Sequence, residues 1–397
     1  MILIDETNKI ECCGCTACAN ICPKNCINMI DDFEGFLYPK VDIDKCVNCG
    51  LCEKICPIKN KFNGRNETEA YVAQHKQKKV LDESSSGGAF SAIANYVINK
   101  GGVVFGVGYD ESLNVVYKYI ESIDRINLLR GSKYVQSYLG KSLNEAKCFL
   151  ENGRLVCFSG TPCQIAGLKA YLGKDYNNLI TIDLVCHGVP SPKLWRRYLD
   201  YHISKSHSSI NEINFRMKTY GYHSGTMGIM FTNGKVYRGS ARVDYMLKSF
   251  FSEISSRPSC YDCAFKTVSH NSDFTIFDCW NFSKMVPKIK DNDRGYTAIL
   301  IHTKKAKNIL NQLTNEIEYY KIDLNEVIKL DGKMVKRSAV PHASRKSFYE
   351  ILNCKSLPKT IEETIPISAT DKIIEKLKVS IYKFGMIKIA QKIKNIK

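Results

Sequence analysis

Ten of the eighteen cysteines in this 397-residue chain fall before residue 57, and eight of them form two runs of identical spacing. Each run has the form C-x2-C-x2-C-x3-C-P, and the second repeats the first at an offset of 34 residues. The eight are Cys12, Cys15, Cys18, Cys22, Cys46, Cys49, Cys52 and Cys56. Cysteines clustered in this way in a long chain predict metal ligands rather than disulfides. The pattern is typical of a module that holds two 4Fe-4S clusters.

The spacing also predicts how the two clusters share their ligands. Three closely spaced cysteines can wrap three corners of one cube, and the fourth cysteine of the run serves the other cube. One cluster is therefore expected on Cys12, Cys15, Cys18 and Cys56, and the other on Cys46, Cys49, Cys52 and Cys22. Paired zinc knuckles are the alternative, but they do not use four-cysteine runs ending in Cys-Pro. Cys13 and Cys26 fall outside the spacing and are expected to be small packed residues.

Four more cysteines are widely dispersed: Cys163, Cys186, Cys260 and Cys263. Four thiolates are what a third cubane needs. From the residues alone, two other interpretations stay open, a nucleophilic cysteine beside His187 or inert buried cysteines. His187 is the one candidate for handling a proton, and a structural histidine is the alternative. Core or incidental positions are expected for Cys148, Cys157, Cys279 and Cys354.

The elements that must position these residues show up as alternating apolar and helical patterns. Strands are expected over 70–74, 102–109, 154–159, 178–185, 273–278 and 296–301. Helices are expected over 88–99, 141–151, 162–172, 192–204, 243–253 and 303–316. This alternation predicts an α/β domain, with a parallel or a mixed sheet left open. The predicted fold is an α+β ferredoxin-like two-cluster module followed by a larger α/β domain.

Domain limits follow from composition. The two-cluster module is expected over 1–62, a polar linker over 63–68, the α/β domain over 69–350 and an extension over 351–397. Residues 371–397 hold eight lysines against two acidic residues, with apolar residues at helical spacing. They predict a basic amphipathic helix that makes weak contact with an anionic membrane surface; a helix docked on its own domain and a frayed tail are the alternatives.

The net charge of +17 lies outside the cysteine-rich module, since residues 1–62 hold seven basic and nine acidic residues. A basic body suits an anionic cofactor, an acidic protein partner or an anionic surface, and a plain solvated surface is the alternative. No nucleic-acid recognition motif is present, so no such partner is expected. A cytoplasmic protein is expected, because neither a membrane-spanning apolar run nor a secretory signal pattern occurs.

Two short segments could bind an anion. Residues 84–91 are rich in serine and glycine directly before a predicted helix, which suits a phosphate group or is a plain helix cap. Residues 130–136 place two cations and a glutamine close together, a combination that suits phosphate or a ring edge and is otherwise ordinary surface.

Several longer sequence segments resemble those of a known family. They are Arg-Gly-Ser-Lys-Tyr-Val-Gln-Ser (130–137), Phe-Ser-Gly-Thr-Pro-Cys-Gln-Ile-Ala-Gly-Leu (158–168), Asp-Leu-Val-Cys-His-Gly-Val-Pro-Ser-Pro (183–192), Cys-Tyr-Asp-Cys (260–263) and Ser-Asp-Phe-Thr-Ile-Phe-Asp-Cys-Trp (272–280). Through them the chain resembles the family of coenzyme F-420 hydrogenase/dehydrogenase beta subunits over residues 1–350.

The resemblance implies that the α/β domain binds a flavin, FAD, with Gly87, Gly88, Lys133 and Thr161 as site candidates. It also favours a third 4Fe-4S cluster on the four dispersed cysteines. The implied function is an oxidoreductase that passes electrons between clusters, flavin and a soluble two-electron acceptor such as coenzyme F-420. Its expected donor is ferredoxin-like or a hydrogenase/dehydrogenase partner, and no residue is assigned to catalysis.

Two other functions stay open. One is an electron-transfer subunit without its own substrate site, and the other is a reductase partner in surface polysaccharide biosynthesis. The chain also departs from the family pattern at Phe277, Cys279 and Asn281, which stand where Gly, Phe and Gly are usual, and His270-Asn271 stand where a basic residue is common. These departures leave the substrate open.

Overall fold

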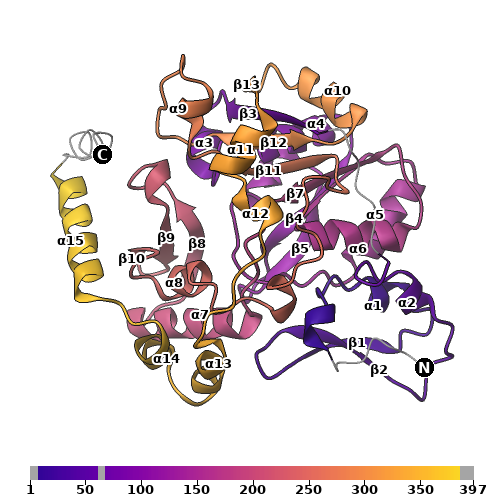
Figure 1. Cartoon of the computed structure of the whole chain (residues 1–397), viewed down its shortest axis with the longest axis horizontal. Helices are drawn as coiled ribbons and strands as arrows, with labels where there is room; N and C mark the ends of the chain where they lie inside the picture. Colours follow the sequence, from indigo (N-terminus) through magenta and orange to yellow (C-terminus); the bar gives the residue numbers. More distant parts are fainter. Residues whose placement is uncertain (1–7, 61–67, 385–397) are drawn as a thin grey trace. The chain divides into compact units, whose positions relative to one another are not determined.

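The computed structural model describes residues 8–60 and 68–384 (Figure 1). The chain divides into two compact units, Met1–Lys193 with Ser256–Val340, and Leu194–Ser255 with Pro341–Lys397. These cuts fall elsewhere than the domain limits expected at 62 and 350, which remain a prediction. The linker expected over 63–68 lies outside the described residues except for Thr68, as do residues 385–397 of the extension.

The cysteine-rich part of the first unit is small and built twice from the same loop. Its elements are η1 (Lys9–Glu11), α1 (Ala17–Ile21), β1 (Ile27–Asp31), β2 (Leu37–Val41) and α2 (Leu51–Lys54). Strands β1 and β2 pair antiparallel. Gly14 and Thr16 have positive φ angles of 71° and 58°, and Asn48 and Gly50, 34 residues later, have 52° and 70°. The repeat in sequence is therefore a repeat in backbone, with left-handed residues that curl each cysteine loop into its helix.

A mixed sheet forms the centre of the first unit. Its strands run in the spatial order β13-β3-β12-β11-β7-β6-β4-β5. Their bounds are β3 (Glu69–His75), β4 (Val103–Tyr109), β5 (Val115–Ile120), β6 (Val156–Gly160), β7 (Leu179–Leu184), β11 (Phe274–Asp278), β12 (Thr297–Ile301) and β13 (Ile317–Ile322). The run β11-β7-β6-β4 is parallel, and the outer pairs are antiparallel. The sheet is thus mixed, which the sequence left open.

Helices cover both faces of this sheet (Figure 1). Besides η1, α1 and α2, the helices of the first unit are α3 (Lys78–Glu83), α4 (Ala89–Asn99), η2 (Ile123–Leu128), α5 (Ser142–Glu151), α6 (Pro162–Leu172), η4 (Pro258–Cys260), α9 (Phe282–Met285), α10 (Lys304–Gln312), α11 (Leu324–Leu330) and α12 (Lys333–Lys336). Helices α4 and α10 share one apolar core, and α5 and α6 share another with Phe105 and Phe158. Every residue of β6 is buried, as expected for a strand covered on both faces.

The second unit packs a three-stranded antiparallel sheet, in the order β10-β9-β8, with helices. Its elements are α7 (Pro192–Ser206, whose first two residues belong to the first unit), β8 (Ile210–Met217), η3 (Tyr222–Ser224), β9 (Thr226–Phe231), β10 (Val236–Ser240), α8 (Tyr245–Phe251), α13 (Arg345–Cys354), α14 (Leu357–Thr364) and α15 (Ala369–Lys383). Trp195 stacks on Tyr198 and Phe215 in its core. Glu375 of α15 accepts hydrogen bonds from the backbone N–H and the hydroxyl of Ser240.

The six strands and six helices predicted after residue 68 all form, with ends within a few residues of expectation. The pattern missed β5, β8, β9, β10 and β13. Within the described ranges, none of the helices combines the length and the apolar character needed to cross a bilayer.

Candidate metal centres

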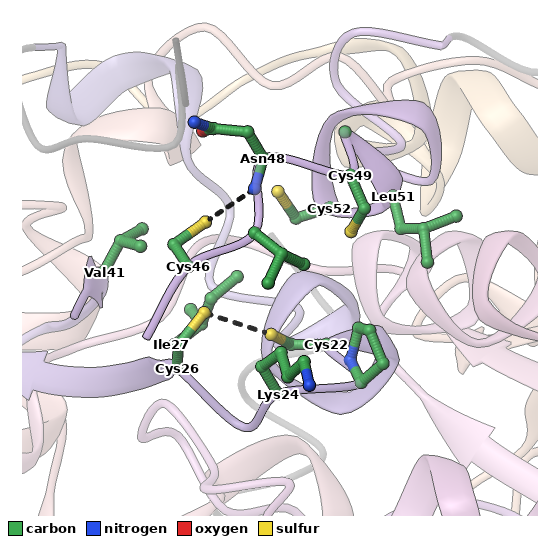
Figure 2. A pocket seen from close by; sticks show the side chains of 13 residues that line it. Cys22, Lys24, Cys26, Ile27, Val41, Cys46, Asn48, Cys49, Leu51 and Cys52 are labelled. Carbon is green, nitrogen blue, oxygen red and sulfur yellow. Dashed lines mark hydrogen bonds between the residues drawn. The ribbon is translucent and has the colours of Figure 1, made fainter. Parts of the chain in front are cut away.

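One group of cysteines gathers at the loop that leads into α2 (Figure 2). The pocket there is lined by five cysteines, Cys22, Cys26, Cys46, Cys49 and Cys52. Cys22 follows α1 and the last three belong to the second run, so the structure brings together the set expected to share one cluster. The backbone N–H of Asn48 donates to Cys46 Sγ at 3.4 Å, a contact that its left-handed conformation permits.

The thiols of this group are suitable ligands for a cluster, but the free space between them is small. The cavity is small, about 20 Å³, and the sulfurs of Cys22 and Cys26 lie 3.3 Å apart. A bound cluster would therefore have to turn these side chains outward. Across the described ranges, no group of three His, Cys, Asp or Glu side chains is arranged to hold a single metal ion. A cubane asks for less convergence, because each of its four iron corners takes its own thiolate.

The other cysteines of the first run lie toward the sheet domain. Burial, followed by the nearby thiols of Cys12 and Cys56, raises the pKa of Cys18 to about 12. Cys15 is buried in the apolar core beneath α5 and α6. Cys12, Cys18 and Cys56 lie near one another, and with Cys15 they form the set expected to hold the other cluster of the module.

Helix α6 packs against this module. A Cβ placed on Gly167 would lie 2.7 Å from Cys15 Cβ and 3.0 Å from Cys15 Sγ, so only glycine allows this approach. One turn earlier the same helix carries Cys163, just after its N-cap Thr161 and the capping box with Gln164. The helix thus places a dispersed cysteine within one turn of a residue that touches the first run.

The four dispersed cysteines line one cavity of about 180 Å³ in the first unit. Cys163 is the second residue of α6, Cys186 follows β7, Cys260 ends η4 and Cys263 lies in the loop after it. Cys13, which stands beside the first ligand of the first run, lines the same cavity. Segments far apart in the sequence therefore converge, and five thiols meet where the sequence alone left a nucleophile or inert cysteines as alternatives.

The thiols of this cavity affect one another. The hydrogen bond that Cys163 donates to Cys13 raises the pKa of Cys163 most, and burial raises it as well. Burial, followed by the nearby thiol of Cys163, raises the pKa of Cys263 to about 12. Burial and then the fields of Cys186 and Cys163 raise the pKa of Cys260. The backbone N–H of Gly188 donates to Cys186 Sγ at 3.4 Å, as N–H groups do toward ligand sulfurs.

Polar side chains complete the cavity wall. Lys266 donates to the backbone carbonyls of Cys186 and Met334. His270 is buried, and its Nδ1 lies 2.7 Å from Asp183 Oδ2 while its Nε2 has no partner. His187, the histidine selected from the sequence, is exposed and is not among the residues that line the cavity. The histidine beside the cysteines is therefore His270, held by a residue 87 positions away.

The residues implied for a flavin lie partly together. Gly88 has a φ of +83° at the N-cap of α4, and Gly87 donates its N–H to Thr297 Oγ1 at 2.9 Å. The loop that carries Lys133 contacts this region, since Ser132 N–H donates to Ser85 Oγ. Lys133 Nζ donates to three carbonyls of its own loop, and burial lowers its pKa to about 7. Thr161 lies at the end of β6, beside Cys163.

The other residues singled out from the sequence lie in the core, at the surface or in hydrogen bonds with neighbouring side chains. Cys157 and Cys279 are fully buried, whereas Cys148 and Cys354 are exposed. Asn281 donates from its backbone and its side chain to the Asp331 carboxylate. Phe277 packs in the apolar core with α11. Sequence reasoning missed Gly167, Lys266 and Arg257, because only the fold shows what they touch.

Comparison with known proteins places both parts of the chain. Residues 11–60 match the model of a 4Fe-4S dicluster domain. Residues 153–327, which include the four dispersed cysteines, match the model for the carboxyl-terminal part of the beta subunit of coenzyme F420 hydrogenase/dehydrogenase. The chain thus joins a 4Fe-4S dicluster domain to a second domain that matches the model of this oxidoreductase family.

Relatives extend over most of the chain at low identity. A subunit of the F420H2 dehydrogenase of Methanosarcina mazei is 22% identical, over 82% of this chain and 88% of its own length. The coenzyme F420-dependent sulfite reductase of Methanocaldococcus jannaschii is 26% identical over 82% of this chain, which spans about half (49%) of that protein. A chain of the F420-reducing [NiFe] hydrogenase complex from Methanosarcina barkeri aligns with a TM-score of 0.46 and 18% identity, over 72% of this chain and 92% of its own.

Proposed function

We propose that this protein is an iron–sulfur oxidoreductase that moves electrons between a protein donor and a soluble two-electron acceptor such as coenzyme F420. The observation that carries the proposal is the cavity in which Cys163, Cys186, Cys260 and Cys263 meet beside the dicluster domain. A set of thiols from separate elements around one space suits a cluster better than scattered structural cysteines.

Three sets of thiols would hold the clusters. They are Cys12, Cys15, Cys18 and Cys56; Cys46, Cys49, Cys52 and Cys22; and Cys163, Cys186, Cys260 and Cys263. A bound 4Fe-4S cluster supplies one-electron transfer at a potential set by charge, hydrogen bonds and burial. The chain itself contributes the N–H donors of Asn48 and Gly188.

Electron transfer between clusters requires that the cysteine sites lie close together, and helix α6 lies against two of them. Cys163 and Gly167 are four residues apart, which is a rise of about 6 Å along a helix. Gly167 lies against Cys15, and Cys13 lines the cavity with Cys163. The module and the cavity therefore abut through their cysteines, without an intervening layer of side chains.

The donor protein would meet the loop around Cys49. That cysteine is exposed, and Ile43, Val47 and Leu51 near it are 80%, 57% and 36% exposed. Apolar side chains around a surface cluster suit the small, transient interface of an electron-transfer encounter. A ferredoxin-like or hydrogenase/dehydrogenase partner is the proposed donor.

Conversion to two-electron chemistry needs a further group. We propose FAD, which supplies hydride transfer when bound, held near Gly87, Gly88, Lys133 and Thr161. The support is the family match together with the contact between the loops that carry Ser85 and Ser132. The departures at Phe277, Cys279 and Asn281 leave the acceptor's identity to experiment.

A membrane contact is proposed for α15 alone. Ile373 and Leu377, one turn apart, are 58% and 57% exposed, and the exposed Lys372 and Lys376 accompany them. Such a pairing suits the surface of an anionic bilayer. Co-sedimentation with phosphatidylserine vesicles, but not with phosphatidylcholine vesicles, is expected, and Leu377→Glu should abolish it. Equal sedimentation of the variant would contradict this contact.

The function is tested by purifying the protein without oxygen and measuring iron, sulfide and flavin together. About twelve irons per chain with bound FAD, and bleaching of the flavin by reduced coenzyme F420, are expected. About eight irons without flavin would favour an electron-transfer subunit that has no substrate site of its own. A colourless zinc protein would contradict both.

A further inference from the structure

Arg257 is a cation enclosed in the first unit. Its side chain is fully buried, at 0% exposure, one of the largest side chains to be so. Over the described parts of the chain, no carboxylate lies within 4 Å of its guanidinium, and its Nη2 has no hydrogen-bond partner. Buried charges are ordinarily paired, since an unpaired one is strongly destabilising. The position therefore lacks a counter-charge.

The partners that Arg257 does have are neutral. Its Nε donates to the carbonyl of Cys12 at 2.8 Å, and its Nη1 donates to the carbonyl of Leu37 and to Gln136 Oε1. The Tyr38 ring centre lies 4.0 Å from its Cζ. An aromatic face attracts a cation but carries no net charge. These contacts hold the guanidinium in place without neutralising it.

The ionisable groups around Arg257 include thiols of two cysteine sites. Its side chain binds Cys12, a residue of the first run, and its carbonyl accepts the N–H of Cys260 in the large cavity. Burial opposes its charge, but the fields of Cys12, Tyr38, Cys13 and Cys260 raise its pKa above the ordinary value. Gly14 is left-handed there, and a Cβ on it would lie 2.3 Å from Gln136 Nε2 and 3.2 Å from Arg257 Cζ. The backbone of the first run is shaped around this pair.

We propose that Arg257 is the shared counter-charge of the two cysteine sites and raises the reduction potentials of the clusters they bind. The inference rests on the proposed function, because it requires clusters on these thiols. Adding an electron makes a thiolate-bound cluster more negative, and a nearby buried cation stabilises that reduced form. The cluster on Cys12, Cys15, Cys18 and Cys56 should respond most, since Arg257 contacts its ligand directly.

The test is a redox titration of anaerobically purified full-length protein with dithionite and mediators, followed by electron paramagnetic resonance. At the wild-type midpoint of the responding cluster, Arg257→Gln should lower the ratio of reduced to oxidised cluster at least about tenfold, which corresponds to about 59 mV for one electron. Arg257→Lys keeps the charge and should stay close to wild type. Arg154→Gln, which removes an arginine paired with Glu121 at the surface, is the matched control and should change nothing.

A second variant covers a failure of Arg257→Gln to fold. Gln136→Glu keeps the hydrogen bond to Arg257 and adds a carboxylate whose negative charge offsets the positive charge of the guanidinium. The same decrease in the ratio of reduced to oxidised cluster is therefore expected. Unchanged midpoints in folded variants with a full iron content would overturn the role of Arg257 and leave the proposed function standing. Absence of any cluster signal from the wild-type protein would instead overturn the proposed function.

Discussion

Thiols in the large cavity have a chemistry set by their surroundings. Burial raises the pKa of Cys186, and burial with neighbouring thiols does the same for Cys260 and Cys263. A nucleophilic cysteine needs a lowered pKa and access to solvent. His187, which the sequence alternative placed beside a nucleophilic cysteine, is exposed and is not among the residues that line the cavity. Cluster ligation, which displaces the thiol protons, is the interpretation that these surroundings favour.

Two cysteines compete for the fourth position of the exposed site, and a pair of variants separates them. Cys22→Ser should abolish one of the module's two paramagnetic signals, because Cys22 completes the set with Cys46, Cys49 and Cys52. Cys26→Ser is the matched control, since Cys26 Sγ lies only 3.3 Å away but is outside the repeated spacing. It should keep both signals. The reverse pattern would show that the crossed assignment is wrong.

Asp244 makes the stability of the second unit depend on pH. Burial raises its pKa from 3.8 to about 6, against hydrogen bonds from Leu247 N–H and from the hydroxyls of Tyr198 and Tyr237. The folded state thus binds this proton more tightly than the unfolded chain. Its stabilisation is complete below the ordinary pKa and is lost as pH rises through about 6, a change on the order of 3 kcal/mol.

Asp244→Asn should remove this dependence while its side-chain oxygen still caps α8. Thermal unfolding measured from about pH 4 to about pH 7 should show a decline for the wild-type second unit and a flatter profile for the variant. Parallel profiles for the two proteins would refute the role of this carboxyl group.

At the scale of the elements, a substitution in helix α6 tests directly how the dicluster module packs against the rest of the first unit. Gly167→Ala would ordinarily favour a helix by about 1 kcal/mol. Here the new Cβ would lie 2.7 Å from Cys15 Cβ, so overpacking should destabilise the protein by about 1–3 kcal/mol and lower its iron content. Denaturant unfolding and iron analysis check both effects. A more stable variant with full iron would mean that α6 and Cys15 do not touch.

Helix α15 depends on one buried carboxylate. Glu375 accepts from Ser240 N–H and from Ser240 Oγ at 2.6 Å, and only 9% of it is exposed. Glu375→Ala leaves both donors without a partner, at a cost of about 1–3 kcal/mol. Faster hydrogen exchange confined to α15 and β10 is expected. Glu362→Ala, on the exposed face of α14, is the control, and equal exchange in the two variants would contradict the anchor.

At the scale of the whole molecule, local patterns were predictable and distant contacts were not. The ligands of the dicluster module repeat at a short, fixed offset, so spacing alone reveals them, and β6 and α6 are indicated by an apolar run and a capping box. His270 and Asp183 meet across 87 residues, and Arg257 reaches Cys12 across 245, which no local pattern records. Strands β8, β9 and β10, which the sequence pattern missed, form a separate sheet within the second unit.

Iron content shows whether the large cavity binds a third cluster. Anaerobically purified wild-type protein should contain about twelve irons and twelve sulfides per chain, and Cys263→Ser about eight of each. Cys148→Ser, which changes an exposed cysteine outside the three sites, should stay at about twelve. About eight irons in all three proteins would contradict the account.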